Sequence, residues 1–360
     1  MPTMRDVAKL ANVSIATVSF VINDTKPVAP ATRARVEEAM RQLDYRRNAL
    51  GRALASKRTR IIALLYPALQ RRLTETAVKF FTSAAQTAKD LGYNLVLWPI
   101  SNEAGQVEEL ISSGFIDGVL LMEVQLDDPR VEPLQRSTMP FALIGRTRHP
   151  EGLPYVDVDF ESSMIEAVSY LDGLGHRRIC FVDSDSAEHG LSGYGPLVRT
   201  RSTFVEEMER RELLTAHISC ANSPISGQAA AEKLLATAPD TTAVILMNDN
   251  ASFGFTNGLN KAGLCVPADM SVLLIGSSPA IAAATEPRLT VMTLPSTALG
   301  RMGVETLIDQ LEERGEPMRQ ALISCSFEEG QSTGPARVLE PGASRGFSRN
   351  CESHSYALSL

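Results

Sequence analysis

The chain has 360 residues, of which 44% are hydrophobic and 21% are charged, so it is long enough to bury more than one core. No apolar run approaches the ~20 residues that cross a bilayer, and the first ten residues lack the apolar centre of a secretion signal. Its five cysteines and five histidines are scattered without the paired spacing of a zinc or redox site. We therefore expect a cytoplasmic protein with no membrane partner, no metal ion and no cofactor.

Positive charge is concentrated at the N-terminal end. Residues 1–60 hold twelve Lys and Arg against five Asp and Glu, a net charge of +7, whereas the rest of the chain carries a net charge of −14. A basic segment attached to an acidic body attracts phosphate through that segment alone. The distribution favours binding of nucleic acid by the first 60 residues.

Two short helices are predicted in residues 4–22. One lies in "MRDVAKLA", and the other runs from Ile15 to Ile22 after a cap in which Ser14 accepts the amide hydrogen of Thr17. Apolar residues at helical spacing give each helix an inward face, namely Val7, Leu10 and Ala11 in the first and Val18, Val21 and Ile22 in the second.

A third helix is predicted from Pro30 to Tyr45, with Val36, Met40 and Leu43 on its apolar face. Because only Asn12 and Val13 join the first two helices, the pattern predicts a helix-turn-helix whose second helix enters the major groove of DNA. A helical hairpin that binds no DNA shows the same spacing. The charge distribution favours DNA binding.

Beyond residue 60, short apolar runs alternate with helical segments, which is typical of an α/β fold. The first half predicts strands in "RIIALLYP", "NLVLWPI", "DGVLLM" and "FALIG", with helices at 74–91 and 106–113. The pattern starts again after about residue 160, with strands in "RRICFVDS", "HISCA", "AVILMND" and "SVLLIGS" and helices at 201–214, 227–236 and 251–262. Near-continuous Val, Ile and Leu runs suit parallel strands covered on both faces. Two doubly wound subdomains are predicted, with a ligand cleft beyond the carboxyl ends of their strands.

Three later segments with strand character lie where the chain can cross between the two halves. They are "YVDVDF", "RLTVMTLP" and "ALISCSF". Asp157, Pro295 and Phe327 are therefore candidate hinge positions.

The chain resembles the LacI family of bacterial transcription regulators, the lac repressor and purine repressor type, over residues 3 to about 335. The resemblance is strongest in "TMRDVAKLANVSIATVSFVIN", "TRARVEEAMRQLDYRRNALGRALAS", "LGHRRI" and "LMNDNASFG". It implies a small all-α helix-turn-helix head followed by an α/β core of two doubly wound, periplasmic-binding-protein-like subdomains. The expected divisions are a head at 1–47, a hinge helix and linker at 48–60, an N-terminal subdomain at 61–158 and 290–323, a C-terminal subdomain at 159–289 and 324–335, and a disordered tail at 336–360.

The resemblance also implies a homodimer that places two heads on a palindromic operator in double-stranded DNA. Ile15, Ala16 and Phe20 occupy the positions that face base edges, although Phe20 can alternatively pack into the small core. Leu54 matches the leucine of a hinge helix that wedges between base pairs and kinks the duplex. The full set of DNA contacts implied is Arg5, Ser14, Ile15, Ala16, Thr17, Ser19, Phe20, Asn23, Arg33, Asn48, Arg52, Leu54 and Ala55.

For a small-molecule effector, the resemblance implies contacts from Tyr66, Arg72, Asp159, Arg201, Asn222, Asn248 and Ser278. Arg199 rivals Arg201, and a surface role for Arg72 is equally open. Ser278 stands where the family usually has the carboxylate that grips sugar hydroxyls. Because this set holds more arginine than carboxylate, it favours an anionic or phosphorylated sugar-like effector.

Three functions compete. The first is a dimeric, effector-controlled repressor, and the N-terminal motif favours it. A regulator without a small-molecule effector is a variant of the first. The second is a solute-binding protein with the same core fold, and the basic head argues against it. The third is an α/β enzyme, for which the sequence offers no glycine-rich phosphate loop and no nucleophile elbow. We expect a non-enzymatic transcription regulator.

Overall fold

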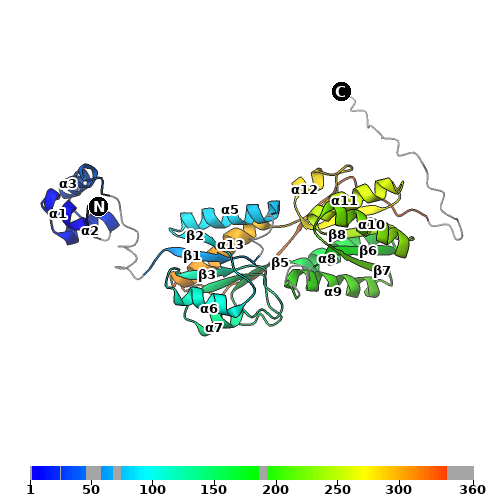
Figure 1. Ribbon diagram of the computed structural model, residues 1–360, viewed down its shortest axis with the longest axis horizontal. Coiled ribbons are helices and arrows are strands. Elements are labelled where there is room, and N and C mark those ends of the chain that lie inside the picture. The colour runs from blue at the N-terminus through cyan, green and yellow to red at the C-terminus, as the bar shows by residue number, and fades with distance from the viewer. Residues whose placement is uncertain (1, 25, 46–57, 68–73, 186–192, 339–360) are drawn as a thin grey trace, which may run out of the picture. The chain divides into compact units, whose positions relative to one another are not determined.

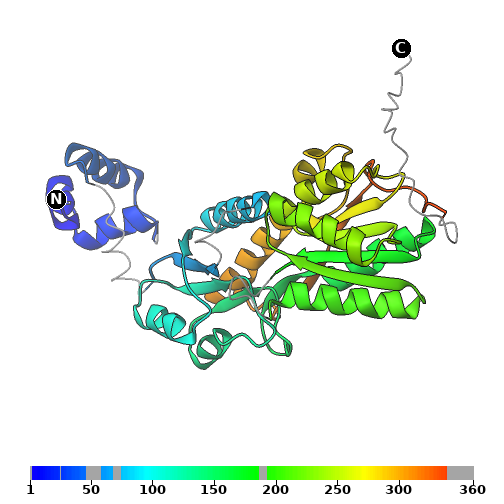
Figure 2. The same cartoon turned by 45° about the vertical axis from the view of Figure 1, so that its right-hand side comes forward.

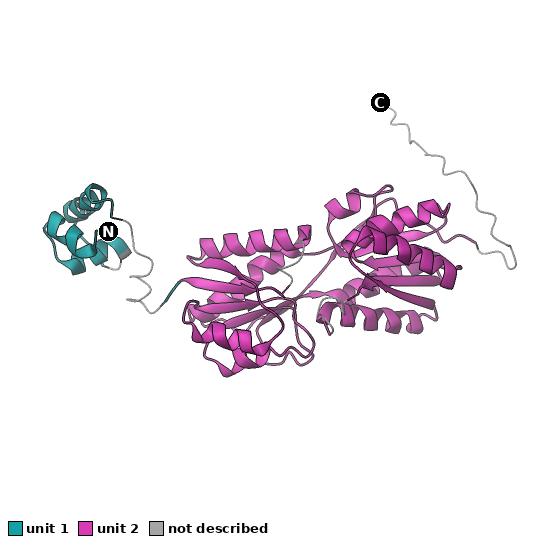
Figure 3. Ribbon diagram, in the orientation of Figure 1, with its two compact units in different colours: residues 1–59 teal, residues 60–360 magenta. Residues whose placement is uncertain are grey.

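The computed structural model describes residues 2–24, 26–45, 58–67, 74–185 and 193–338. The chain divides into two compact units, residues 1–59 and residues 60–360 (Figure 3). Within the described ranges, no helix has the length and apolar character needed to cross a membrane.

The described part of the first unit contains three helices, α1 (Met4–Ala11), α2 (Ile15–Asn23) and α3 (Pro30–Gln42). Asn12 ends α1 in the left-handed backbone region, with a φ of 51°, which allows the chain to turn sharply before α2. The hydroxyl of Ser14 accepts the Thr17 amide hydrogen at an N···O distance of 3.0 Å, so the predicted cap is confirmed.

The core of the head is shared by α1, α2 and α3, as predicted. Val18 and Val36 are fully buried, and Val21 and Ile22 pack beside them. The prediction was wrong for Leu10, whose side chain is 48% exposed. In α1, Val7, Ala8 and Ala11 form the contiguous inward stripe, and Leu10 lies on the other side of Val7 from Ala8.

The second unit begins with an entirely parallel sheet of six described strands in the order β11-β5-β4-β3-β1-β2. Four described helices accompany it, with α5 and α13 on one face and α6 and α7 on the other (Figure 1). The strands are β1 (Ile61–Leu65), β2 (Asn94–Trp98), β3 (Gly118–Leu121), β4 (Phe141–Ile144), β5 (Tyr155–Asp159) and β11 (Gln320–Ser324). The helices are α5 (Glu75–Asp90), α6 (Ala104–Ser112), α7 (Val131–Arg136) and α13 (Ser296–Leu311).

A second sheet has the strand order β12-β10-β9-β8-β6-β7, in which only the described pairing of β10 with β12 is antiparallel. Helices α8 and α9 pack on one face, and α10, α11 and α12 pack on the other. The strands are β6 (Arg178–Ser184), β7 (Leu214–Cys220), β8 (Ala243–Met247), β9 (Ser271–Ser277), β10 (Thr290–Thr293) and β12 (Ser326–Glu328). The helices are α8 (Phe160–Gly173), α9 (Gly195–Arg210), α10 (Pro224–Thr237), α11 (Asp249–Lys261) and α12 (Pro279–Ala283).

The chain crosses between the two subdomains at β5–α8, β10–α13 and β11–β12. Pro295 lies at the second crossing, whereas Asp157 and Phe327 lie inside strands, two residues from the other two. Residues 290–293 were assigned to the N-terminal subdomain, but β10 pairs with β9 in the second sheet, which corrects that boundary. Of the hinge segment and the tail, residues 46–57 and 339–360 lie outside the described residues.

Helix α9 begins well before the residue that its pattern predicts. Helix α9 starts at Gly195 rather than at Arg201, because Pro196 occupies the first turn, where a proline fits without losing a hydrogen bond. It ends at Arg210, and Leu214 already belongs to β7.

Helices α10 and α11 cross at very close range, side by side over the second sheet (Figures 1 and 2). A Cβ atom added at Gly254 would lie 1.7 Å from the carbonyl oxygen of Pro224, and one added at Gly227 would lie 2.0 Å from that of Ala251. Each helix therefore needs a glycine where the other passes. This crossing fixes the N-terminal ends of both helices, which border the cavity described below.

Candidate DNA-binding surface and effector cavity

Helix α2 presents its outer face to solvent. Ile15 is 44% exposed and Ala16 is exposed, while Thr17 and Ser19 are half-buried beside them. Phe20 is also half-buried, and the Lys26 ammonium nitrogen lies 5.1 Å from its ring centroid. The aromatic ring of Phe20 thus remains partly accessible and is not enclosed in the core.

The other predicted DNA contacts fall in different places. Arg5 is exposed on α1, and Arg33 on α3 forms an ion pair with Asp24 at the end of α2. Asn23 ends α2. Four predicted contacts in the hinge segment lie outside the described residues, namely Asn48, Arg52, Leu54 and Ala55.

A cavity of about 630 Å³ lies between the two subdomains of the second unit. Its walls include the ends of β3, β6 and β8 and the starts of α10 and α11, so it occupies the position expected for parallel sheets. Aromatic side chains on its walls are Tyr66, Phe80, Phe160 and Tyr194. The arrangement of apolar walls with convergent polar groups is typical of a small-molecule site.

Three of the predicted effector contacts line this cavity, namely Tyr66, Asn222 and Asn248. Asp159, Arg201 and Ser278 are not among its described lining residues, and Arg72 lies outside the described residues. The rival candidate Arg199 does not line the cavity either.

The two asparagines are held by the backbone. Asn248 caps α11 by accepting the Ala251 amide hydrogen, and its amide nitrogen donates to the Cys220 carbonyl oxygen at 3.2 Å. The side-chain oxygen of Asn222 accepts the Asn250 amide hydrogen at 3.0 Å. These bonds fix the orientation of both amides at the cavity wall.

The predicted contacts outside the cavity have partners in the protein itself. Arg201 donates to Asp183 at 2.6 Å, and Asp183 also accepts the Ser219 hydroxyl. Ser278 donates its hydroxyl to Glu75 at 2.6 Å, which joins the C-terminal subdomain to α5 of the N-terminal subdomain. Asp159 caps α8 by accepting the Ser162 amide hydrogen.

Carboxylates dominate the charged groups of the cavity wall. The described lining contains Glu123, Asp157, Asp185 and Asp249 and no Lys, Arg or His. Burial raises the pKa of the Asp249 carboxyl, whose described hydrogen-bond partner is the Ser277 hydroxyl. The described wall therefore favours a ligand with hydroxyl or amine donors, contrary to the predicted preference for an anion.

Glu123 and Tyr194 line the cavity but were not among the predicted effector contacts. Asp185 directly follows β6 and Glu123 is the second residue after β3, so its position just beyond a predicted strand could have identified Glu123. Tyr194 precedes α9, whose start was predicted too late. In the described part of the chain, no cluster of His, Cys, Asp or Glu side chains is suited to a metal ion.

Comparison with protein-family models yields two matches. Residues 3–48 match the model for bacterial regulatory proteins of the lacI family, and residues 168–333 match a periplasmic binding protein-like domain. The first match covers the helix-turn-helix head, and the second covers most of the C-terminal subdomain.

Curated relatives align over most of the chain. The HTH-type transcriptional regulator CelR of Thermobifida fusca is 30% identical over 342 residues, which span 89% of this chain and 95% of that protein. Catabolite control protein A of Priestia megaterium is 28% identical over 320 residues, spanning 85% and 91%. These relatives are regulators and not enzymes, in agreement with the prediction.

Solved structures share the fold. The CelR–cellobiose complex has a TM-score of 0.68 and 26% identity and covers 92% of this chain and 100% of that chain. The lac repressor dimer bound to operator and the anti-inducer ONPF has a TM-score of 0.80 at 21% identity, with coverage of 92% and 99%. The predicted fold class, a helix-turn-helix head with two periplasmic-binding-protein-like subdomains, is confirmed.

Proposed function

Because this chain belongs to the lacI family of bacterial regulatory proteins, we propose that it represses transcription as a homodimer bound to a palindromic operator, in the cytoplasm, under the control of a small molecule. The observation that carries the proposal is helix α2, which buries Val18 and Val21 and exposes Ile15 and Ala16 behind the Ser14 cap. A helix that packs one face into the head and leaves the other face exposed can insert the exposed face into the major groove.

The exposed face of α2 suggests how the operator is read. Ile15 and Ala16 offer apolar contact to thymine methyl groups and cannot form the paired hydrogen bonds that distinguish guanine or adenine. Phe20 adds a third apolar group of larger size. Sequence preference then depends on methyl contacts, on Arg5 and Asn23 nearby, and on the deformability of the central base step.

The proposed function is tested by selecting genomic fragments that the full-length protein retains, followed by binding measurements with the enriched sequence. A palindromic sequence is expected, with affinity that falls steeply as salt is added, because each neutralised phosphate releases counterions. If no sequence is enriched, or if affinity is insensitive to salt, the protein is not an operator-binding repressor of this kind.

For the effector, the described cavity wall supports a polyhydroxylated molecule over a phosphorylated one. Four carboxylates accept hydrogen bonds from hydroxyl groups, while Asn222 and Asn248 add fixed amides. Tyr66 and Phe80 supply apolar faces on which a sugar ring can lie. The CelR structure is described as a cellobiose complex, and a neutral saccharide is accordingly the proposed class for this chain.

Leu54 provides a prediction from the resemblance alone, since it lies outside the described residues. Leu54→Ala is expected to lower operator affinity by at least tenfold and to reduce operator bending, because the wedge between base pairs is lost. Effector binding to the core is expected to stay unchanged. Affinity and bending equal to those of the wild type, measured by gel retardation of circularly permuted fragments, would assign Leu54 a packing role.

A further inference from the structure

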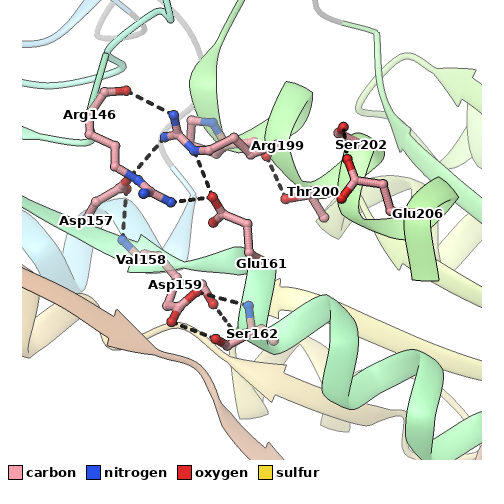
Figure 4. A network of polar contacts seen from close by, with 12 residues as sticks. Arg146, Asp157, Val158, Asp159, Glu161, Ser162, Arg199, Thr200, Ser202 and Glu206 are labelled. Atoms are coloured by element: carbon pink, nitrogen blue, oxygen red, sulfur yellow. Dashed lines mark hydrogen bonds and ion pairs between the residues drawn. The ribbon is translucent and has the colours of Figure 1, made fainter. Parts of the chain in front are cut away.

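Four charged side chains connect the two subdomains beside the cavity. Arg146 and Asp157 belong to the N-terminal subdomain, after β4 and in β5, whereas Glu161 and Arg199 belong to α8 and α9 of the C-terminal subdomain. Arg146 pairs with Glu161, and Arg199 donates to Asp157 at 2.9 Å, so each subdomain contributes one cation and one anion to its neighbour (Figure 4). We call these four residues the cross-hinge cluster.

Three members of the cluster are well shielded from water, and the Glu161 side chain is 29% exposed. The side chains of Arg146 and Arg199 are 18% and 15% exposed, and that of Asp157 is 4% exposed. Arg199 also donates to the carbonyl oxygen of Arg146 at 3.2 Å. In such surroundings a charge is stabilised only by close partners, and removing one partner leaves the other poorly compensated.

Asp157 is the one member of the cluster among the described residues that line the cavity. One of its oxygens accepts from Arg199 at 2.9 Å and from Arg146 at 3.3 Å, and the other accepts the Val158 amide hydrogen at 2.8 Å. A carboxylate has about four acceptor positions. Asp157 thus engages two guanidinium groups and retains capacity for one donor from the cavity side.

We infer that Asp157 is a specificity-determining residue that excludes anionic effectors, because its own carboxylate occupies the place where Arg146 and Arg199 would otherwise hold a ligand anion. The inference rests on the proposed effector function of the cavity and deepens it. A phosphate or carboxylate that enters the cavity is repelled by the Asp157 carboxylate, and the guanidinium groups of Arg146 and Arg199 are already paired with that carboxylate. A hydroxyl donor meets an acceptor.

Asp157→Asn keeps the size of the side chain and removes its charge, which leaves two guanidinium groups against the single carboxylate of Glu161. The cross-hinge cluster beside the cavity then carries a net positive charge. The variant is expected to bind inorganic phosphate at least tenfold more tightly than the wild type does.

Asp249→Asn is the matched control. It removes one negative charge from the same cavity, but the described hydrogen-bond partner of Asp249 is the hydroxyl of Ser277 and not a guanidinium. Its affinity for phosphate is expected to change less than threefold. Adding Arg199→Gln to Asp157→Asn is expected to abolish the gain, because the freed donor is gone.

The experiment is calorimetric titration of full-length protein with inorganic phosphate at constant ionic strength, with folding checked by circular dichroism. Equal gains in Asp157→Asn and Asp249→Asn would overturn the inference, and so would a gain that survives Arg199→Gln. If Asp157→Asn does not fold, Asp157→Ser is scored by the same criteria. Micromolar binding of phosphate to the wild type would also refute it, whatever the variants do. Operator binding by the same samples tests the proposed function separately, because it does not depend on the cavity charge.

Discussion

Val18→Asn is expected to unfold the helical head and lower specific DNA affinity by more than 100-fold. Val18 is completely buried among residues of all three helices of the head. The substitution forfeits about 1.5 to 3 kcal/mol of apolar burial and buries an amide without partners, at a further cost of about 1 to 3 kcal/mol. A core as small as this one supplies only about 3 to 5 kcal/mol in total. The head therefore does not remain folded.

Leu10→Asn is the matched control for this prediction, because Leu10 is an apolar residue of the same head with its side chain 48% exposed. Its stability is expected to change by less than about 0.5 kcal/mol. Operator binding by fluorescence anisotropy, together with helix content by circular dichroism, distinguishes the two variants. If Val18→Asn retained operator affinity within threefold of the wild type, the core of the head would have been assigned wrongly.

Gly254→Ala is expected to have the largest effect in the second unit. The added Cβ would lie 1.7 Å from the carbonyl oxygen of Pro224, which is backbone and cannot rotate away, so helices α10 and α11 must move apart. Overpacking of this severity costs about 3 kcal/mol or more, which corresponds to a fall of at least about 5 °C in Tm for a unit of this size. The cavity residues Asn222 and Asn248, which stand at the starts of these helices, are displaced with them.

Gly105→Ala provides the comparison, since Gly105 is also a helical glycine but has nothing within 4 Å of the added Cβ. Alanine favours helix by up to about 1 kcal/mol relative to glycine, so the Tm is expected to stay equal or to rise slightly. Scanning calorimetry of both variants decides the matter. A Gly254→Ala protein with an unchanged Tm would show that the two helices do not cross as closely as described.

The spacing of apolar residues predicted most of the helices and strands, because in these elements the apolar side chains are the ones that the structure buries. The inward face of α2, with Val18, Val21 and Ile22, and the continuous strands such as β8 and β9 are apolar where the structure buries them. The prediction fails where two neighbouring residues could both fill the inward face of a helix. Leu10 fits a helical stripe by spacing, yet the structure buries Ala8 beside Val7 and Ala11 and leaves Leu10 48% exposed.

The cavity was harder to predict because its residues come from the ends of separate strands. Asn222 and Asn248 were identified through the family motif, but Ser278 and Arg201 bond to Glu75 and Asp183 and do not line the described cavity. Whether an ionisable side chain meets a ligand or a protein partner depends on distances between elements far apart in sequence. The Asp157–Arg199 pair, 42 residues apart, is such a case.

The discontinuous first sheet has a consequence for synthesis on the ribosome. Its apolar face, which includes Leu120 and Ile144, is covered by α13, and its edge strand β11 follows later still. Both segments follow β6 to β10 in the chain, so the part of that face under α13 stays uncovered until about residue 311 has been made. The second sheet has all but its edge strand β12 by then. The N-terminal subdomain is therefore translated first but completed last.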